Sequence, residues 1–210
     1  MFNLDLGSDS VAGPFLAWSA IGTRDGAVPQ RSFYIRSTDG KTPFDASKGL
    51  VFDIDAIKTG WQHSEGAVGM APQWKWNPSV SQMMPKPGDD YKKGFSIPVA
   101  LGGGKTAIWE QAGSSVWLAL EAIAPILSQR PDATSLPIFR HADSRFVQFN
   151  KGSTVVPVLE LVKWTARPDA LKEGVAAGIA MEPTPAPQPA PKPVAQPAPI
   201  QPAVIDDMEF

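Results

Sequence analysis

The chain has 210 residues, with 19 basic residues, 21 acidic residues, a net charge of −2, two histidines and no cysteine. Disulfides, thiolate catalysis and cysteine-ligated zinc are therefore excluded, and His63 and His141 lack the spacing of metal ligands, so we expect no metal site and no cofactor. No run of 18 apolar residues and no signal-peptide pattern occurs, so we expect a cytoplasmic protein with no membrane partner.

The first half of the chain is predicted to form strands. Residues 50–57 alternate apolar and acidic residues, which is typical of a half-buried strand and puts Asp53 and Asp55 on its solvated face. The residues that follow are rich in proline and glycine, as expected of a long loop or an extra ribbon. The expected elements are strands at 14–21, 31–37 and 50–57 and an inserted region at 58–94.

The second half contains a hairpin, a helix and two further strands. Three consecutive glycines predict the tip of the hairpin. Apolar residues at spacings of four, three and four predict one helical face, with Ser114 or Ser115 as the N-cap and a kink or an early end at Pro125. The expected elements are strands at 95–101 and 106–111, a helix at 114–129 carrying Val116, Leu120, Ile123 and Leu127 on one face, and strands at 146–149 and 155–164.

This order of elements predicts a mainly β fold. Several strands, one helix and two more strands are similar to the oligonucleotide-binding barrel, which has five strands and a helix between the third and the fourth. We therefore predict an OB-fold-like barrel over residues 1–180, with the extra residues accounted for by the inserted region.

The end of the chain has a different composition. Nine of the twenty residues in 183–202 are proline, so we expect residues 181–202 to be a disordered, extended linker in a polyproline II conformation. Residues 203–210 follow as an acidic tip that ends in an aromatic residue. Its interacting side chains are expected to be Asp206, Asp207, Met208, Glu209 and Phe210.

The linker and the tip together resemble those of bacterial and phage single-stranded DNA-binding proteins. In that family a flexible linker leads to several aspartates, a hydrophobic residue, one further residue and a final phenylalanine. The resemblance implies that the tip recruits proteins of replication, recombination and repair, and that the body binds single-stranded DNA. The family usually has proline before the last phenylalanine, where this chain has Glu209. The oligomeric state does not follow from the sequence.

The body offers aromatic and basic residues for such binding. Trp74 and Trp76 alternate around Lys75, so both rings face one way on an extended strand, and Tyr34 and Arg36 likewise share a face. Aromatic rings stack on bases without sequence preference, and cations follow the phosphates. The candidate DNA-binding residues are Trp18, Arg31, Tyr34, Arg36, Lys58, Trp61, Trp74, Lys75, Trp76, Lys92, Lys93 and Lys105.

The charge balance sets a condition on this hypothesis. One basic and three acidic residues lie in 183–210, which leaves 18 of each sign in residues 1–182. DNA-binding domains are usually basic, so the cations of a neutral body have to gather on one face.

Two other functions fit parts of the sequence. A structural or carbohydrate-binding phage module would use the tryptophans to stack on sugars and would suit a neutral body. A nucleotide-binding enzyme would use Lys105 and Thr106, but the phosphate-binding motif requires glycine at position 99, which is Val99. No other catalytic motif is present, so we expect no enzyme.

Deletion of residues 203–210 is expected to tighten single-stranded DNA binding and to abolish recruitment of partner proteins. The reason is that the acidic tip competes with DNA for the same cations of the body. Titration of tryptophan fluorescence with poly(dT) measures the first effect, and equal affinities of the full-length and truncated proteins would reject the competition.

Overall fold

The computed structural model describes residues 14–64, 72–150 and 152–172, so the linker at 181–202 and the tip at 203–210 lie outside the described residues. The described part is mainly β with one main α-helix, as predicted, and a short helical turn at 169–172 follows the last strand. Its strands are β1 (Phe15–Ser19), β2 (Ser32–Ser37), β3 (Gly40–Phe44), β4 (Leu50–Phe52), β5 (Lys58–His63), β6 (Gln73–Trp76), β7 (Lys92–Gly102), β8 (Lys105–Ala112), β9 (Ser135–Phe149) and β10 (Gly152–Ala166). The helix is α1 (Ser114–Leu127), and two short 3-10 helices are η1 (Ala46–Lys48) and η2 (Ile54–Ala56).

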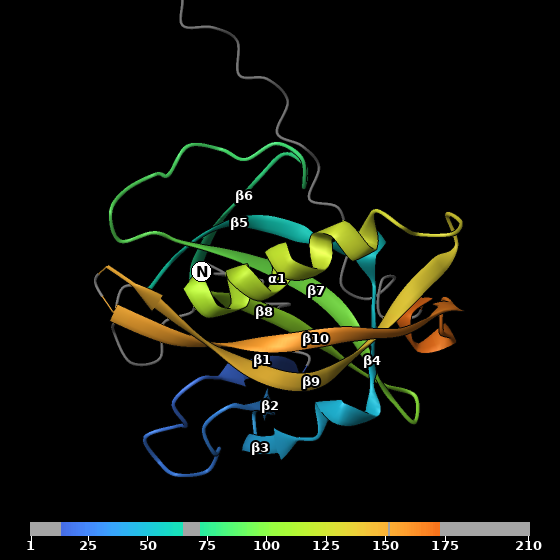
Figure 1. The fold of residues 1–210 in the computed structure, drawn as a ribbon, viewed down its shortest axis with the longest axis horizontal. Coiled ribbons are helices and arrows are strands. Elements are labelled where there is room, and N and C mark those ends of the chain that lie inside the picture. Colours follow the sequence, from blue (N-terminus) through green and yellow to red (C-terminus); the bar gives the residue numbers. More distant parts are fainter. Residues whose placement is uncertain (1–13, 65–71, 151, 173–210) are drawn as a thin grey trace, which may run out of the picture. The chain divides into compact units, whose positions relative to one another are not determined.

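The strands form one strongly curled sheet, a half-barrel (Figure 1). Its order is β10-β9-β4-β7-β8-β1-β2-β3, and β5 branches from β7 and carries β6 on its other edge. All pairs are antiparallel except β1 with β8. The predicted inserted region therefore contributes a ribbon, β5 with β6, to the sheet.

A hydrophobic core lies on the inner side of the curl. Phe33, Ile97, Trp109 and Phe139 are fully buried there, and α1 adds Val116 and other apolar side chains of its predicted face. Trp109 lies edge-on to three phenylalanine rings, at centroid distances of 4.9 to 5.7 Å. Burial of each such side chain stabilises the fold by about 1.5–3 kcal/mol, so this core fixes which side of each strand faces inward.

The strand predicted at 50–57 is interrupted, which corrects that expectation. β4 ends at Phe52, η2 follows, and β5 begins at Lys58. Pro98 of β7 has no N–H to donate and lies opposite this break, where its carbonyl accepts a hydrogen bond from the Asp53 N–H at 2.9 Å.

The helix begins at Ser114 as predicted, but its N-cap and its end differ from the prediction. Neither Ser114 nor Ser115 is the N-cap; that position is Gly113, with φ 128° and no side-chain cap. Pro125 lies inside the last turn, and α1 ends two residues later at Leu127. A proline so near the end of a helix removes few hydrogen bonds, so the helix continues past it.

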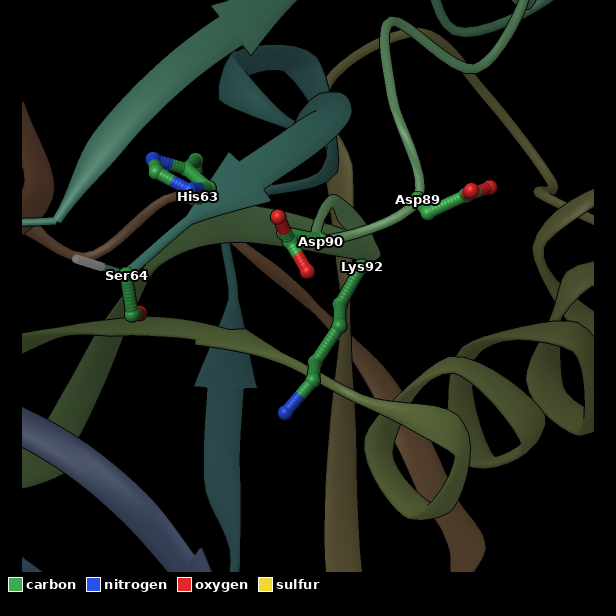
Figure 2. Close-up of a pocket in the computed structure, with 5 residues that line it drawn as sticks. All are labelled: His63, Ser64, Asp89, Asp90 and Lys92. Carbon is green, nitrogen blue, oxygen red and sulfur yellow. The ribbon is translucent and has the colours of Figure 1, made fainter. Parts of the chain in front are cut away.

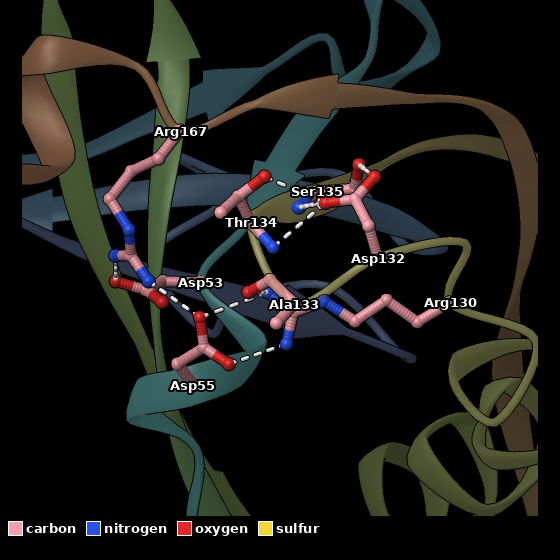
Figure 3. Close-up of polar contacts among 8 residues, drawn as sticks. All are labelled: Asp53, Asp55, Arg130, Asp132, Ala133, Thr134, Ser135 and Arg167. Atoms are coloured by element: carbon pink, nitrogen blue, oxygen red, sulfur yellow. Dashed lines mark hydrogen bonds and ion pairs between the residues drawn. The ribbon is translucent and has the colours of Figure 1, made fainter.

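An ion-pair network, shown in Figure 3, lies at η2 and corrects the expectation that Asp53 is solvated, whereas Asp55 is exposed as expected. The Asp53 side chain is completely buried and pairs with Arg167, which follows β10. Asp55 bridges Arg167 at 2.8 Å and Arg130 at 2.6 Å, and the hydrogen bond from Arg130 is the main reason why the pKa of Asp55 is lowered. In the adjoining loop, hydrogen bonds from Ser135 and Thr134 lower the pKa of Asp132. The network ties the end of β10 to the turn that leads into β5.

Replacement Arg167→Met is expected to lower the free energy of unfolding by about 3 kcal/mol, because it leaves the buried Asp53 carboxylate without its cation. Urea unfolding followed by circular dichroism measures the loss. The matched control is Arg140→Met, which breaks an exposed pair with Glu160 and is expected to cost less than about 1 kcal/mol. Equal losses in the two variants would contradict the structural role of the buried pair.

Candidate nucleic-acid interface

The pairing of the strands brings half of the predicted site residues to one side of the sheet. Trp76 is paired with Gly60, and Gly60 with Gly94; Trp74 is paired with Gln62, and Gln62 with Lys92. Directly paired residues point to the same side, so this side continues across β8 and β1 to β2. We call this side, opposite the core, the outer face; its main side chains are Tyr34, Arg36, Lys58, Trp74, Trp76, Lys92 and Glu110.

Two indole rings stack on one another on the outer face. The rings of Trp74 and Trp76 lie 4.2 Å apart and within 7° of parallel, and both side chains are half-buried. The Trp74 Nε1–H donates a hydrogen bond of 2.9 Å to Glu110 Oε1 on β8, which fixes the orientation of the ring.

Gly94 leaves the space that the Trp74 ring occupies. A Cβ at this position would lie 2.7 Å from the Trp74 ring, 2.7 Å from the Ala112 Cβ and 2.6 Å from the Gln111 carbonyl oxygen. Real Cβ atoms do not approach so closely, so the indole can cross β7 towards Glu110 only because residue 94 is glycine.

Positive charge is concentrated on the strands that build this face. β1 to β3 and β5 to β8 carry seven basic residues and one acidic residue, Glu110. Among the described residues, only Lys41 of the seven forms an ion pair, with Asp25 at 3.0 Å. The basic residues are Arg36, Lys41, Lys58, Lys75, Lys92, Lys93 and Lys105. These strands therefore carry an excess of positive charge, and of their cations Arg36, Lys58 and Lys92 are exposed on the outer face.

Three predicted residues lie on the opposite side of the β5–β6 ribbon. Trp61 is paired with Lys75 and Lys93, and the Lys93 ammonium lies 6.0 Å from the centre of the Trp61 ring and 5.3 Å from that of Trp117. Lys75 lies 5.0 Å from the centre of the Tyr91 ring. Trp61 is only 7% exposed and donates to the Met84 carbonyl, so Lys75 and Lys93 are the accessible members of this group.

Trp18 belongs to the core, which corrects its place among the stacking residues. It is 3% exposed, its ring packs on Phe33 and His141, and its Nε1–H donates to the Val155 carbonyl. His141 lies half-buried on β9 against this part of the core, and burial lowers its pKa.

The remaining two predicted residues lie away from the stacked indoles. Arg31 is exposed just before β2, with φ 57°. Lys105 begins β8, at the end opposite Glu110, and lines a mainly apolar hollow of about 710 Å³ with Ile35 and Phe44. Neither residue extends the outer face.

A second hollow, of about 640 Å³, borders the outer face at Lys92 (Figure 2). His63, Ser64, Asp89 and Asp90 complete its lining. The two carboxylates make it unsuitable for a phosphate group. Within the described ranges, no three histidine or acidic side chains are placed to hold a metal ion.

Three residues of the site were not predicted from the sequence: Glu110, Gly94 and Lys41. The alternation of Thr106–Gln111 already put Glu110 opposite Trp109, which marks it as outward-facing. Its partner Trp74 lies 36 residues earlier, however, and the two meet only through the registers of β6 with β5, β5 with β7 and β7 with β8.

No protein-family model, curated protein or solved structure matches the chain. In the part of the chain that the structure describes, no helix is long and apolar enough to cross a membrane.

Replacement Gly94→Ala is expected to displace the Trp74 ring and to lower the free energy of unfolding by about 1–3 kcal/mol, because the new methyl group has no space. The tryptophan emission spectrum and urea unfolding report the two effects. Gly88→Ala is the control, since its nearest neighbour, the Tyr91 ring, would lie at an ordinary contact distance of 3.6 Å. A Gly94→Ala protein with unchanged emission and stability would show that Gly94 does not hold the ring.

Proposed function

We propose that the protein binds single-stranded DNA without sequence preference and acts in DNA replication, recombination or repair, in a phage or its bacterial host. The observation that carries this proposal is the outer face, where a stacked pair of tryptophans lies on the same side of the sheet as the exposed cations Arg36, Lys58 and Lys92. Rings that stack on bases and cations that meet phosphates are the two parts that such binding requires.

Each part has a defined place on the outer face. Trp74 and Trp76 present aromatic surface to unpaired bases, while Lys58 and Lys92 are exposed beside them on β5 and β7. Arg36 lies over the Phe15 ring, 5.1 Å from its centre, and so continues the basic surface across β1 and β2. Tyr34 adds a further half-buried ring on the same strand as Arg36.

The connectivity supports an oligonucleotide-binding barrel. The bent segment β4–η2–β5 pairs with both β7 and β9, β7 forms a hairpin with β8, and α1 precedes the β9–β10 hairpin. Five strands with a helix between the third and fourth are the pattern of that barrel, whose second and third strands form the binding face. In this assignment β7 and β8 are those strands, and β1 to β3 are an addition at the N-terminal side.

The tip of the β9–β10 hairpin is a second element suited to DNA. Phe146 and Phe149 are 61% and 40% exposed, and Arg145 beside them is exposed. No acidic residue occurs from 144 to 159. Exposed aromatic residues in a segment without acids are suited to an unpaired polyanion, and they flank the binding face in the proposed barrel.

The linker at 181–202 would then connect this body to the tip. Asp206, Asp207, Met208, Glu209 and Phe210 offer acidic and aromatic groups for a basic, apolar pocket on a replication or repair protein. This assignment depends on the resemblance of the tail to the single-stranded DNA-binding proteins.

The double variant Trp74→Ala/Trp76→Ala is expected to bind poly(dT) more weakly by about 1–3 kcal/mol for each base that loses its stacking partner. Fluorescence anisotropy with a labelled oligothymidylate measures the affinity. The control is Trp164→Ala, which removes a half-buried tryptophan of β10 that lies outside the outer face.

Lys58→Ala tests the phosphate contacts in the same titration. It should reduce the slope of log affinity against log salt by about 0.7, whereas Lys48→Ala, at an exposed residue of η1, should leave it unchanged. Wild-type protein that is retained on a glycan column but shows no affinity for oligothymidylate at low salt would favour the carbohydrate-binding alternative.

A further inference from the structure

Glu110 is the unexpected residue of the outer face. It is the one acidic residue on β1 to β3 and β5 to β8, and it lies at the centre of a surface that otherwise attracts phosphate. A carboxylate there opposes a polyanion, so its presence needs a reason that outweighs the repulsion.

Its contacts supply that reason. Glu110 Oε1 accepts the Trp74 Nε1–H at 2.9 Å, and the Ser96 hydroxyl also hydrogen-bonds the carboxylate. The Trp74 ring is thereby held across Gly94 and parallel to Trp76. An indole N–H donates one hydrogen bond, so Glu110 is the hydrogen-bond partner that orients a ring for which Gly94 leaves the space.

The charged groups around Glu110 come from two other strands. Arg36 of β2 and Lys58 of β5 both act on the carboxylate electrostatically, and neither is within ion-pair distance of it. Their side chains are exposed, with β6 and β7 contributing only the uncharged groups Trp74 and Ser96 to the contacts of the carboxylate. The two cations therefore flank a negative centre.

We propose that Glu110 is a positioning residue of the DNA site: its hydrogen bond sets the Trp74–Trp76 stack for bases, and its charge directs phosphates outward to Arg36 and Lys58. This inference rests on the proposed function of the outer face. In this arrangement, bases lie over the centre of the face and the backbone follows its cations.

The charge and the hydrogen bond are separable by substitution. Glu110→Gln keeps an acceptor for Trp74 but removes the charge, so the affinity for oligothymidylate should rise about threefold or more, from the loss of a repulsion at close range. Glu110→Ala removes both, so the ring loses its orientation and the affinity should fall about fivefold, in spite of the lost repulsion. Opposite directions for the two variants are the signature of positioning.

The pH dependence gives a readout that a purely structural residue would not move. Burial raises the pKa of Glu110 above the ordinary value of 4.5. As the pH falls towards this raised pKa, the carboxylate becomes neutral and DNA affinity should increase; as the pH rises through it, the gain is lost. Glu110→Gln should lack this component of the increase as the pH is lowered from neutral.

The control is Glu121→Gln. Glu121 also accepts a tryptophan N–H, from Trp117, but on α1 and away from the outer face. It should leave the affinity and its pH dependence unchanged. Anisotropy titrations of wild type, Glu110→Gln, Glu110→Ala and Glu121→Gln against one labelled oligothymidylate, with urea unfolding to confirm folded protein, make the comparison.

The outcomes are distinguishable. Affinities that rise equally in Glu110→Gln and Glu110→Ala would overturn the positioning role, because charge alone would then explain both. Affinities equal to wild type in both variants would overturn the whole inference, although DNA binding that still depends on Trp74 and Trp76 would leave the proposed function standing. Absence of binding by the wild-type protein would remove the proposed function itself.

Discussion

The register between β7 and β8 is the constraint on which the rest of the structure depends. Ile97 is paired with Trp109 on the core side, and Ser96 with Glu110 on the outer side. Because side chains alternate, a shift of one residue would put Trp109 into water and Glu110 into the core, at a cost that no other contact offsets. The burial of Trp109 among phenylalanine rings therefore determines, on the other side of the same strands, which groups form the outer face.

The same dependence explains which features the sequence could predict. The hairpin around Gly102, the face of α1 and the shared side of Trp74 and Trp76 follow from neighbouring residues, and the structure has all three. The burial of Trp18 depends on its pairing with Phe33, and that of Asp53 on an arginine 114 residues later. Such partners leave no local periodicity, so a buried tryptophan and a stacking tryptophan look the same in the sequence.

For a related reason, the net charge of the body does not indicate the charge of the strands that build the outer face. The body is neutral over its length, but its acids that the structure describes lie mainly in loops and turns, where several of them pair with a cation close by, as Asp25 does with Lys41 and Asp89 with Lys86. Most of the cations on the strands of the outer face have no such partner among the described residues. Folding therefore separates an evenly charged sequence into paired loops and a basic sheet, and the field near a ligand is set by this separation.

The two tryptophan–glutamate pairs show how folding and function are coupled here. Trp117 and Glu121 are four residues apart on one helix, so their contact needs only local structure. Trp74 and Glu110 meet across three ladders, from β6 through β5 and β7 to β8, and their contact requires that every register be correct. A ring oriented in this way is present only in the fully assembled sheet. Because the hydrogen bond is long-range, an unfolded or misregistered chain would not display the stacked pair, and the aromatic surface would form together with the cations that surround it.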